Sequence, residues 1–224
     1  MKISKETLEV LKNFSAINPN LVIKPGNKLS SIAEAKNIMS AVEVTETFPK
    51  EVGIYDLNEF LSALSLIEDP DLEFGDDSVV IKSDLASLTY RYADTSILTA
   101  PVKEVTMPES EVTINLSADD ISQIRRAGAA LGHPVCSITS YDGSDTTYLE
   151  VKDPENSTAN VFQLDVGYSG NAVFDFQFLI ANLKLVPGDY EVSVSSKLIS
   201  HWKCINNNSV EYWIALEKNS AFNN

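Results

Sequence analysis

The sequence has few of the side chains from which most catalytic and metal sites are built. Its 224 residues include only two cysteines, Cys136 and Cys204, and two histidines, His133 and His201. Two cysteines do not make a disulfide framework in a chain of this length, which favours a reducing, cytosol-type compartment. Neither a phosphate-binding glycine loop ending in Lys-Ser/Thr nor a His-Glu-x-x-His motif occurs. An enzyme is therefore the weakest of the function classes that we consider.

Long apolar runs are absent as well. No stretch of about 18 consecutive apolar residues exists, so we expect no membrane-spanning helix. The first residues, MKISKETLEVLKNF, lack the apolar core of a signal peptide. With 44% apolar and 22% charged residues, the composition is that of a soluble, folded protein.

Positive charge is scarce throughout the chain. The 17 Lys and Arg residues face 32 Asp and Glu residues, which gives a formal net charge of −15. The excess is even, because residues 1–110 hold 10 basic and 18 acidic residues and residues 111–224 hold 7 and 14. Such an acidic surface repels nucleic acid non-specifically. Any contact with DNA must therefore be confined to a local basic patch.

A first amphipathic helix is predicted over 4–18, with Ser4 as its cap. Its apolar residues fall on one side at 100° per residue, while Lys5 and Lys12 are seven residues apart and share a line on the other side. A charged helix face is usually only solvated. Glu9 lies between the two lysines at helical contact spacing and could pair with either of them.

A second amphipathic helix is predicted over 117–131, in SADDISQIRRAGAALG. Ser117 and Asp120 form an approximate capping box. The buried stripe is Ile121, Ile124, Gly128 and Leu131, which leaves Arg125 and Arg126 on the outward side. The question is why so acidic a chain places two arginines side by side.

The remaining pattern repeats itself. Helices are predicted to start at Asp56 and within FDFQFLIANLKLV at 174–186, with short strands and a turn at 206–208 elsewhere. Ile54–Asn58 aligns with Val173–Gln177 at an offset of 119 residues, and the helices at 4–18 and 117–131 align at an offset of 113. Both matches favour an internal duplication. The segment 99–110 has two prolines and no periodicity, so we predict domains at 1–100 and 111–224, with 101–110 as a linker.

Four residues share the types and spacing of zinc ligands. His133 with Cys136 and His201 with Cys204 both read His-x-x-Cys. Positions i and i+3 of a strand face opposite sides, so neither pair chelates unless a turn intervenes. Buried cysteine is also common without any ligand role. The pattern favours no metal site.

Acidic and aromatic residues also invite functional interpretations. The acidic runs at 68–71 and 75–77 lack the spacing of a calcium loop and are typical of turns. Asp56 and Asp175 match across the repeat, where helix capping is a better explanation than a catalytic pair. Tyr90 and Tyr92 alternate with polar residues, which indicates either core packing or an edge strand at a subunit interface.

Four passages, taken in order, resemble the sliding clamp (DNA polymerase processivity factor) of T4-type bacteriophages. They are KISKETLEVLKNFSAIN, IYDLNEFLSALSLIEDPD, INLSADDISQIRRAGAALG and FQFLIANLKLVPGDYEV. The resemblance implies an α+β DNA-clamp fold of two similar domains, each with antiparallel sheets covered on one side by two helices. It also implies that three chains join head to tail in a ring whose helices line the hole.

The resemblance further implies a non-enzymatic function without cofactor or membrane. The ring would encircle duplex DNA regardless of sequence and tether the replicative DNA polymerase in the cytoplasm of the infected host. An ATP-dependent clamp loader and phage transcription factors are further implied partners, and partner peptides would dock in an apolar pocket beside the linker, near 101–107. The expected DNA-facing residues are Lys5, Lys12, Arg125 and Arg126, followed by Lys2 and by Lys184, the last on its expected helical position alone. The alternative is an acidic, β-rich phage structural or assembly protein that does not encircle DNA.

Overall fold

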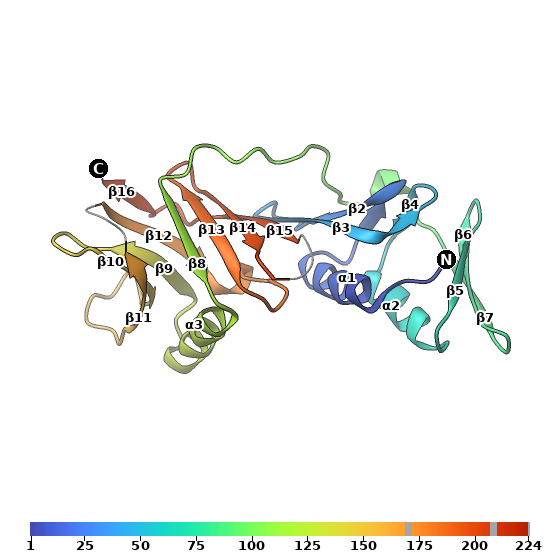
Figure 1. Cartoon of the computed structure of the whole chain (residues 1–224), viewed down its shortest axis with the longest axis horizontal. Coiled ribbons are helices and arrows are strands. Elements are labelled where there is room, and N and C mark those ends of the chain that lie inside the picture. The colour runs from blue at the N-terminus through green and yellow to red at the C-terminus, as the bar shows by residue number, and fades with distance from the viewer. Residues whose placement is uncertain (169–171, 207–209, 224) are drawn as a thin grey trace. The chain divides into compact units, whose positions relative to one another are not determined.

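The chain forms two compact units in the computed structural model, which describes all residues except 169–171, 207–209 and 224. Unit 1 comprises Met1–Glu104 with a few residues from the second half of the chain, among them Lys184–Val186, and unit 2 comprises most of the remainder (Figure 1). The segment 101–110 contains no helix or strand. The exact domain limits given above stay a prediction. No helix of the described part is both long and apolar enough to span a membrane.

Unit 1 combines two helices with short antiparallel strands. β1 pairs with β4, β2 pairs with β3, and β5, β6 and β7 form a three-stranded sheet. The elements are α1 (Lys5–Ile17), β1 (Leu21–Ile23), β2 (Gly26–Ile32), β3 (Ile38–Phe48), β4 (Val52–Ile54), α2 (Leu57–Ser65), β5 (Asp71–Phe74), β6 (Ser78–Lys82), β7 (Ser87–Arg91) and the 3-10 turn η1 (Thr95–Ile97).

The helix α1 begins at a cap shared with a distant strand. The Ser4 side chain accepts a hydrogen bond from the backbone N–H of Thr7 at 3.2 Å. Glu46 on β3 accepts from the Ser4 backbone N–H and, at 2.6 Å, from the Thr7 hydroxyl. Burial acts to raise the pKa of the Glu46 carboxyl, but these hydrogen bonds outweigh it, so the pKa is lowered.

The helix α2 starts as the sequence predicts. The Asp56 side chain caps it by accepting from the backbone N–H groups of Asn58 and Glu59, at 2.9 and 3.3 Å. Both helices of unit 1 lie on the same side of β2 and β3 (Figure 1). Tyr90 packs edge-on against Phe60 of α2, with ring centroids 5.1 Å apart. Since β7 pairs only with β6 among the described strands, Tyr90 belongs both to the core and to an edge strand.

Unit 2 holds one long helix and two layers of strands. In one layer the strand order is β11-β10-β9-β12-β16, and in the other β8, β13, β14 and β15 are successive antiparallel neighbours. The elements are β8 (Val112–Leu116), α3 (Ala118–Leu131), β9 (Val135–Ser140), β10 (Thr146–Val151), β11 (Phe162–Tyr168), β12 (Val173–Leu179), the 3-10 turn η2 (Ile180–Asn182), β13 (Tyr190–Ser195), β14 (Ile199–Cys204), β15 (Glu211–Ala215) and β16 (Ala221–Asn223).

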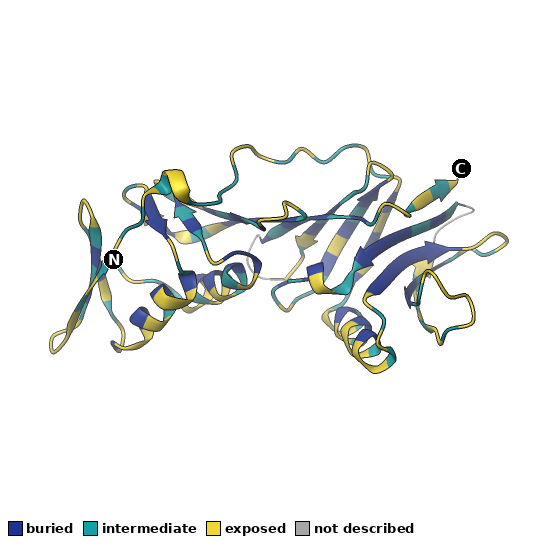
Figure 2. Ribbon diagram, turned by 180° about the vertical axis from the view of Figure 1, so that it is seen from behind, coloured by how far each residue is buried: buried dark blue, intermediate teal, exposed yellow. Residues whose placement is uncertain are grey.

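The core of unit 2 lies where α3 and the two strand layers meet. Phe178 of β12 packs edge-on against Trp202 of β14, with ring centroids 5.8 Å apart. Ile121 and Ile124 of α3 line the same small internal space. Gly128 allows close packing beside η2, because a Cβ there would lie 2.5 Å from the Ile180 Cδ1 atom. This core orients α3 and leaves its opposite side exposed (Figure 2).

The helix predicted within 174–186 does not form. Val173–Leu179 is the strand β12, which pairs with β9 and β16, and only Ile180–Asn182 makes a single 3-10 turn. The residues FDFQFL alternate aromatic and polar side chains, which is the period of a strand. The described part of unit 2 therefore has one α-helix where two were expected, and the alignment at offset 119 pairs a helix start with a strand. The turn predicted at 206–208 lies mostly outside the described residues.

Candidate nucleic-acid interface

The outward side of α1 carries Lys5 and Lys12. Burial of Val10, Leu11 and Phe14 fixes the helix against unit 1, so both lysines are exposed. Within the described ranges neither lysine has an ion pair or a side-chain hydrogen bond. Glu9, which could have paired with either lysine, is exposed and has no such contact in the same ranges. Two unneutralised ammonium groups therefore lie on one line of the helix.

Lys2 and Lys184 lie at opposite ends of α1, and both have partners. Lys2 forms an ion pair with Asp69, and this hydrogen bond is the main reason why the pKa of Lys2 is raised. The Lys184 ammonium donates to the carbonyl of Ala16 in the last turn of α1, where a positive charge complements the helix dipole. Lys184 follows η2 and lies on no helix, so the reason given for it from the sequence is wrong.

The helix α3 holds its arginines on the exposed side. Its capping box is complete: the Asp120 N–H donates to the Ser117 hydroxyl at 3.1 Å, and the Ser117 N–H donates to the Asp120 carboxylate at 2.8 Å. Ile121, Ile124 and Gly128 are buried as predicted, and Leu131 is half-buried. The helix ends at Gly132, which is left-handed with φ 70°.

Both arginines of α3 have internal partners. The Arg125 guanidinium donates to the backbone carbonyl of Leu183, just after η2. Arg126 lies 3.6 Å from the carboxylate of Asp119, two helical turns earlier, and both side chains are about 70% exposed. A surface ion pair of this kind contributes at most about 1 kcal/mol. Arg126 can thus replace its ion pair with Asp119 by a contact to a phosphate at little cost in free energy. Arg125 would have to give up its hydrogen bond to the Leu183 carbonyl to do the same.

The two His-x-x-Cys pairs serve structural contacts. Cys136 is buried on β9, and burial raises the pKa of its thiol to about 12. Cys204 donates to the carbonyl of Asn206. The His133 ring lies 3.1 Å from the Asn160 carbonyl, and His201 stacks on Trp213. The described residues contain no group of three His, Cys, Asp or Glu side chains placed to hold a metal ion.

A buried polar cluster on unit 2 was not found from the sequence. Lys152 lies 3.2 Å from the carboxylates of both Glu150 and Asp175. Glu150 also accepts from Gln163 at 2.8 Å and from the Tyr141 hydroxyl. Asp175 was expected to cap a helix, but it lies on β12 and holds a lysine instead. Glu150, Gln163 and Asp175 come from three different strands, and Lys152 and Tyr141 directly follow strands, so no local pattern could have indicated this cluster.

Two family models together match most of the chain. The model described as DNA polymerase processivity factor matches residues 4–96, and the model described as gp45 sliding clamp, C terminal, matches residues 113–218. Among curated relatives, the sliding clamp of Vibrio phage KVP40 is 32% identical over 97% of this chain and 99% of its own length. The chain belongs to the sliding clamp family. The sliding clamp of Enterobacteria phage T4 is 29% identical over 99% of both chains.

Solved structures show the same fold at low sequence identity. The proliferating cellular nuclear antigen of Entamoeba histolytica has a TM-score of 0.68 and 14% identity, with 95% of each chain covered. The H. pylori beta clamp has a TM-score of 0.71 and 10% identity, covering 97% of this chain and 65% of the other. The clamp fold predicted from the sequence is therefore confirmed, and so is membership in the T4-like phage family. Members of this family are accessory processivity factors of DNA polymerase.

Proposed function

We propose that three copies of the chain close head to tail into a ring around duplex DNA and tether the replicative polymerase. The exposed sides of α1 and α3 face the DNA, with Lys5, Lys12, Arg125 and Arg126 as the phosphate contacts. Lys2 and Lys184 contribute less, because both already have internal partners. Membership in the sliding clamp family supports the function itself. The ring follows from the family resemblance, and its DNA contacts are argued from the exposed cations of α1 and α3.

One observation carries the assignment of these contacts. Lys12 follows the cap Ser4 by eight residues, and Arg125 follows the cap Ser117 by eight residues. Both side chains are exposed, each on the helix that covers the strands of its own unit. A duplicated scaffold thus presents a cation at the same place in each half. In a closed ring of three copies this arrangement repeats around the hole.

The scarcity of basic residues suits a protein that must slide. Contacts to phosphates carry no sequence information, whereas contacts to base edges would hold the ring at one site. Each phosphate contact adds to affinity in a salt-dependent way, so a few contacts suffice and many would hinder movement. The charge of −15 discourages DNA from binding elsewhere on the surface. The two adjacent arginines of α3 are explained if they contact DNA phosphates and make no contact with base edges.

The proposed ring also needs partner proteins, which would act with it in the infected host cell. A ring must be opened to admit DNA, for which we propose an ATP-dependent loader. Phage transcription factors, and a peptide pocket beside 101–107, follow from the family resemblance. The edge strand β7 is a candidate contact between copies, because it is open on one side among the described strands. The chain would act in the host cytoplasm and catalyse no reaction.

Two measurements test the ring. Light scattering across concentration should give three times the 24.6 kDa mass of the chain. The loaded protein should stay on nicked circular DNA and leave after linearisation. An acidic structural or assembly protein would show no dependence on DNA topology, which would overturn the proposal.

A charge-reversal series tests the contacts. Arg125→Glu with Arg126→Glu, and separately Lys5→Glu with Lys12→Glu, should weaken retention while the trimer stays intact. Lys24→Glu with Lys36→Glu is the matched control, because both lysines are exposed in unit 1 and the change in net charge is equal. Loss of the trimer in the first two variants would place those residues in a subunit interface. Equal loss of retention in the control would show a general charge effect.

A further inference from the structure

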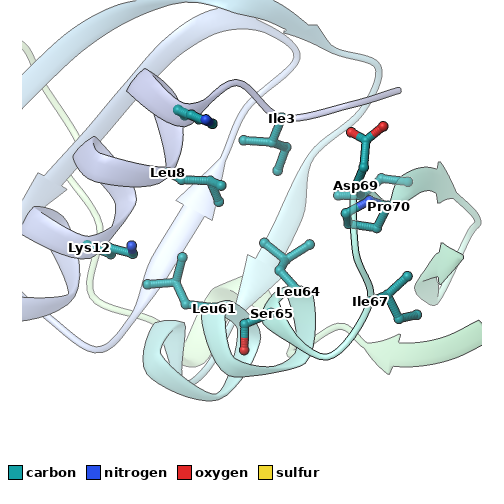
Figure 3. Close-up of a pocket in the computed structure, with 11 residues that line it drawn as sticks. Ile3, Leu8, Lys12, Leu61, Leu64, Ser65, Ile67, Asp69 and Pro70 are labelled. Carbon is teal, nitrogen blue, oxygen red and sulfur yellow. The ribbon is translucent and has the colours of Figure 1, made fainter. Parts of the chain in front are cut away.

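Unit 1 has an apolar cleft between α1 and α2. Its volume is about 370 Å³, which lies in the range of ligand-binding clefts. The floor is aliphatic and buried, formed by Leu64, Ile67 and Leu72, and half-buried Leu8 and Leu61 form the walls. Figure 3 shows Leu8 on α1 facing Leu61 and Leu64 on α2. The cleft thus offers a place for a few apolar side chains from outside the chain.

The charge around this cleft is one-sided. Lys5 and Lys12 belong to its lining and lie on the α1 wall, while Asp69, at the far end, is already paired with Lys2. Figure 3 shows Lys12 beside the opening. Both α1 lysines lack a carboxylate partner in the described part of the chain, although the surface has a large acidic excess. The cleft therefore combines apolar walls with two unneutralised cations along one rim.

We propose that this cleft binds an acidic amphipathic helix of a partner protein. Lys5 and Lys12 are seven residues, or two turns, apart, so their Cα atoms are about 10 Å apart along the axis. Carboxylates seven residues apart on a second helix have the same spacing and lie on one line. Apolar side chains at i, i+4 and i+7 beside them would enter the cleft, as in other helix-in-groove complexes.

The acidic surface elsewhere on the chain would direct an acidic helix to this cleft. An acidic helix is repelled by most of a chain with net charge −15, so attraction is confined to the cationic rim. The inference does not need the ring. If the proposed function is also correct, the same two lysines serve DNA and the partner helix, and the two cannot bind one copy together. The partner would then engage a copy only when that copy is free of DNA.

The experiment uses a synthetic helical peptide as the probe and the full chain as the receptor. The peptide carries leucines at i, i+4 and i+7 and two glutamates seven residues apart beside the leucine stripe. A control peptide has both glutamates replaced by lysine. Fluorescence anisotropy measures affinity, and methyl NMR locates the site. The acidic peptide should bind at least about tenfold more tightly than the control and should shift the methyl signals of Leu8, Leu61 and Leu64.

Variants of the chain separate this proposal from the DNA contacts. Ser65→Glu adds a negative charge to the exposed part of the α2 wall, and Leu61→Gln makes the same wall polar without changing its charge. Each should weaken peptide binding at least about fivefold, and Leu61→Gln, which changes no charge, should leave retention on circular DNA unchanged. Lys5→Glu with Lys12→Glu should weaken both, and Lys24→Glu with Lys36→Glu should weaken neither.

Three results would overturn the inference. The acidic peptide could fail to show saturable binding up to about 1 mM, both peptides could bind equally, or the methyl shifts could be confined to another surface. If peptide binding fails while DNA retention responds to Lys5 and Lys12, only this inference is wrong. If the peptide binds but retention of the protein does not depend on DNA topology, only the proposed function is wrong.

Addition of a short duplex should release the peptide, and a ternary complex on one copy would contradict the shared use of the lysines.

Discussion

The helices α1 and α3 occupy equivalent places in the two units but are stabilised differently. Their caps, Ser4 and Ser117, are 113 residues apart, and Thr7 stands where α3 has Asp120. In α3 the carboxylate that completes the cap is its own Asp120, whereas in α1 it is Glu46 of β3. One helix carries its start signal in its own sequence, and the other receives it from a strand about 40 residues away. The same cap geometry can thus arise from local sequence or from tertiary structure.

The outward sides of the two helices differ in a related way. Lys5 and Lys12 of α1 are without ion-pair partners in the described ranges, while Arg125 and Arg126 of α3 are held by Leu183 and Asp119. Leu8 of α1 borders an open cleft, and Ile121, at the matching position of α3, is buried. The cations of α1 are therefore more available to a ligand than those of α3. Of the matching residues Leu8 and Ile121, only Leu8 borders a cleft that a ligand could enter.

The largest expected effect concerns the two caps. Glu46→Ala leaves the Ser4 N–H and the buried Thr7 hydroxyl without their acceptor, and each unsatisfied group costs about 1–3 kcal/mol. We expect a loss of about 2–3 kcal/mol in the free energy of unfolding, measured by chemical denaturation. Asp120→Ala removes a partly exposed cap and should cost about 1 kcal/mol. Equal losses would show that the source of the carboxylate does not matter.

The next effect concerns the exposed cations. Lys5→Glu with Lys12→Glu should lower the affinity of the ring for a short duplex about tenfold, because free cations are replaced by repulsive charges. Arg125→Glu with Arg126→Glu should lower it by about threefold, since these arginines are partly engaged already. Titrations at several salt concentrations provide the comparison. A larger effect for the arginine pair would reverse the ranking of the two helices.

A smaller effect tests the close packing of α3. Gly128→Ala should cost about 1 kcal/mol, because overpacking against Ile180 outweighs the gain in helix propensity. The matching residue of α1 is Ser15, whose hydroxyl donates to the Lys12 carbonyl at 2.9 Å. Ser15→Ala should change stability by no more than about 0.5 kcal/mol. Thermal denaturation of both variants checks the difference, and a neutral Gly128→Ala would show that η2 can move away.

The smallest effect is a pH dependence. The pKa of Glu46 is lower in the folded chain than its ordinary value of 4.5, so the ionised carboxylate stabilises the fold above that value. This contribution is lost as the pH falls through the folded-state pKa, below 4.5. The stability difference between the natural chain and Glu46→Gln should therefore shrink as the pH is lowered from 7 into this range. A constant difference would show that the charge of Glu46 is unimportant.

What the sequence predicts well is what neighbouring residues determine. The starts of α1, α2 and α3 follow from Ser4, Asp56 and Ser117, because a cap acts within three residues of itself. The apolar stripes then place the lysines and arginines outward. At β12 the strand period of FDFQFL was mistaken for part of a helix.

What the sequence does not predict depends on contacts between distant residues. The cap supplied by Glu46, the carbonyl that holds Arg125, and the cluster around Lys152 each join segments that no local pattern connects. The cleft between α1 and α2 is of the same kind, since Leu8 and Leu61 are 53 positions apart in the chain. Such features can be identified only once the fold is known, because their stabilisation comes from burial and from partners that the fold brings together.

The most direct test of the central claim is retention on DNA of defined topology. The chain, loaded on nicked circular DNA, should elute with the DNA in gel filtration and separate from it after a single cut. Lys5→Glu with Lys12→Glu should reduce the retained fraction, and Lys24→Glu with Lys36→Glu should not. Equal retention on circular and linear DNA would contradict a ring whose basic helix faces surround the duplex.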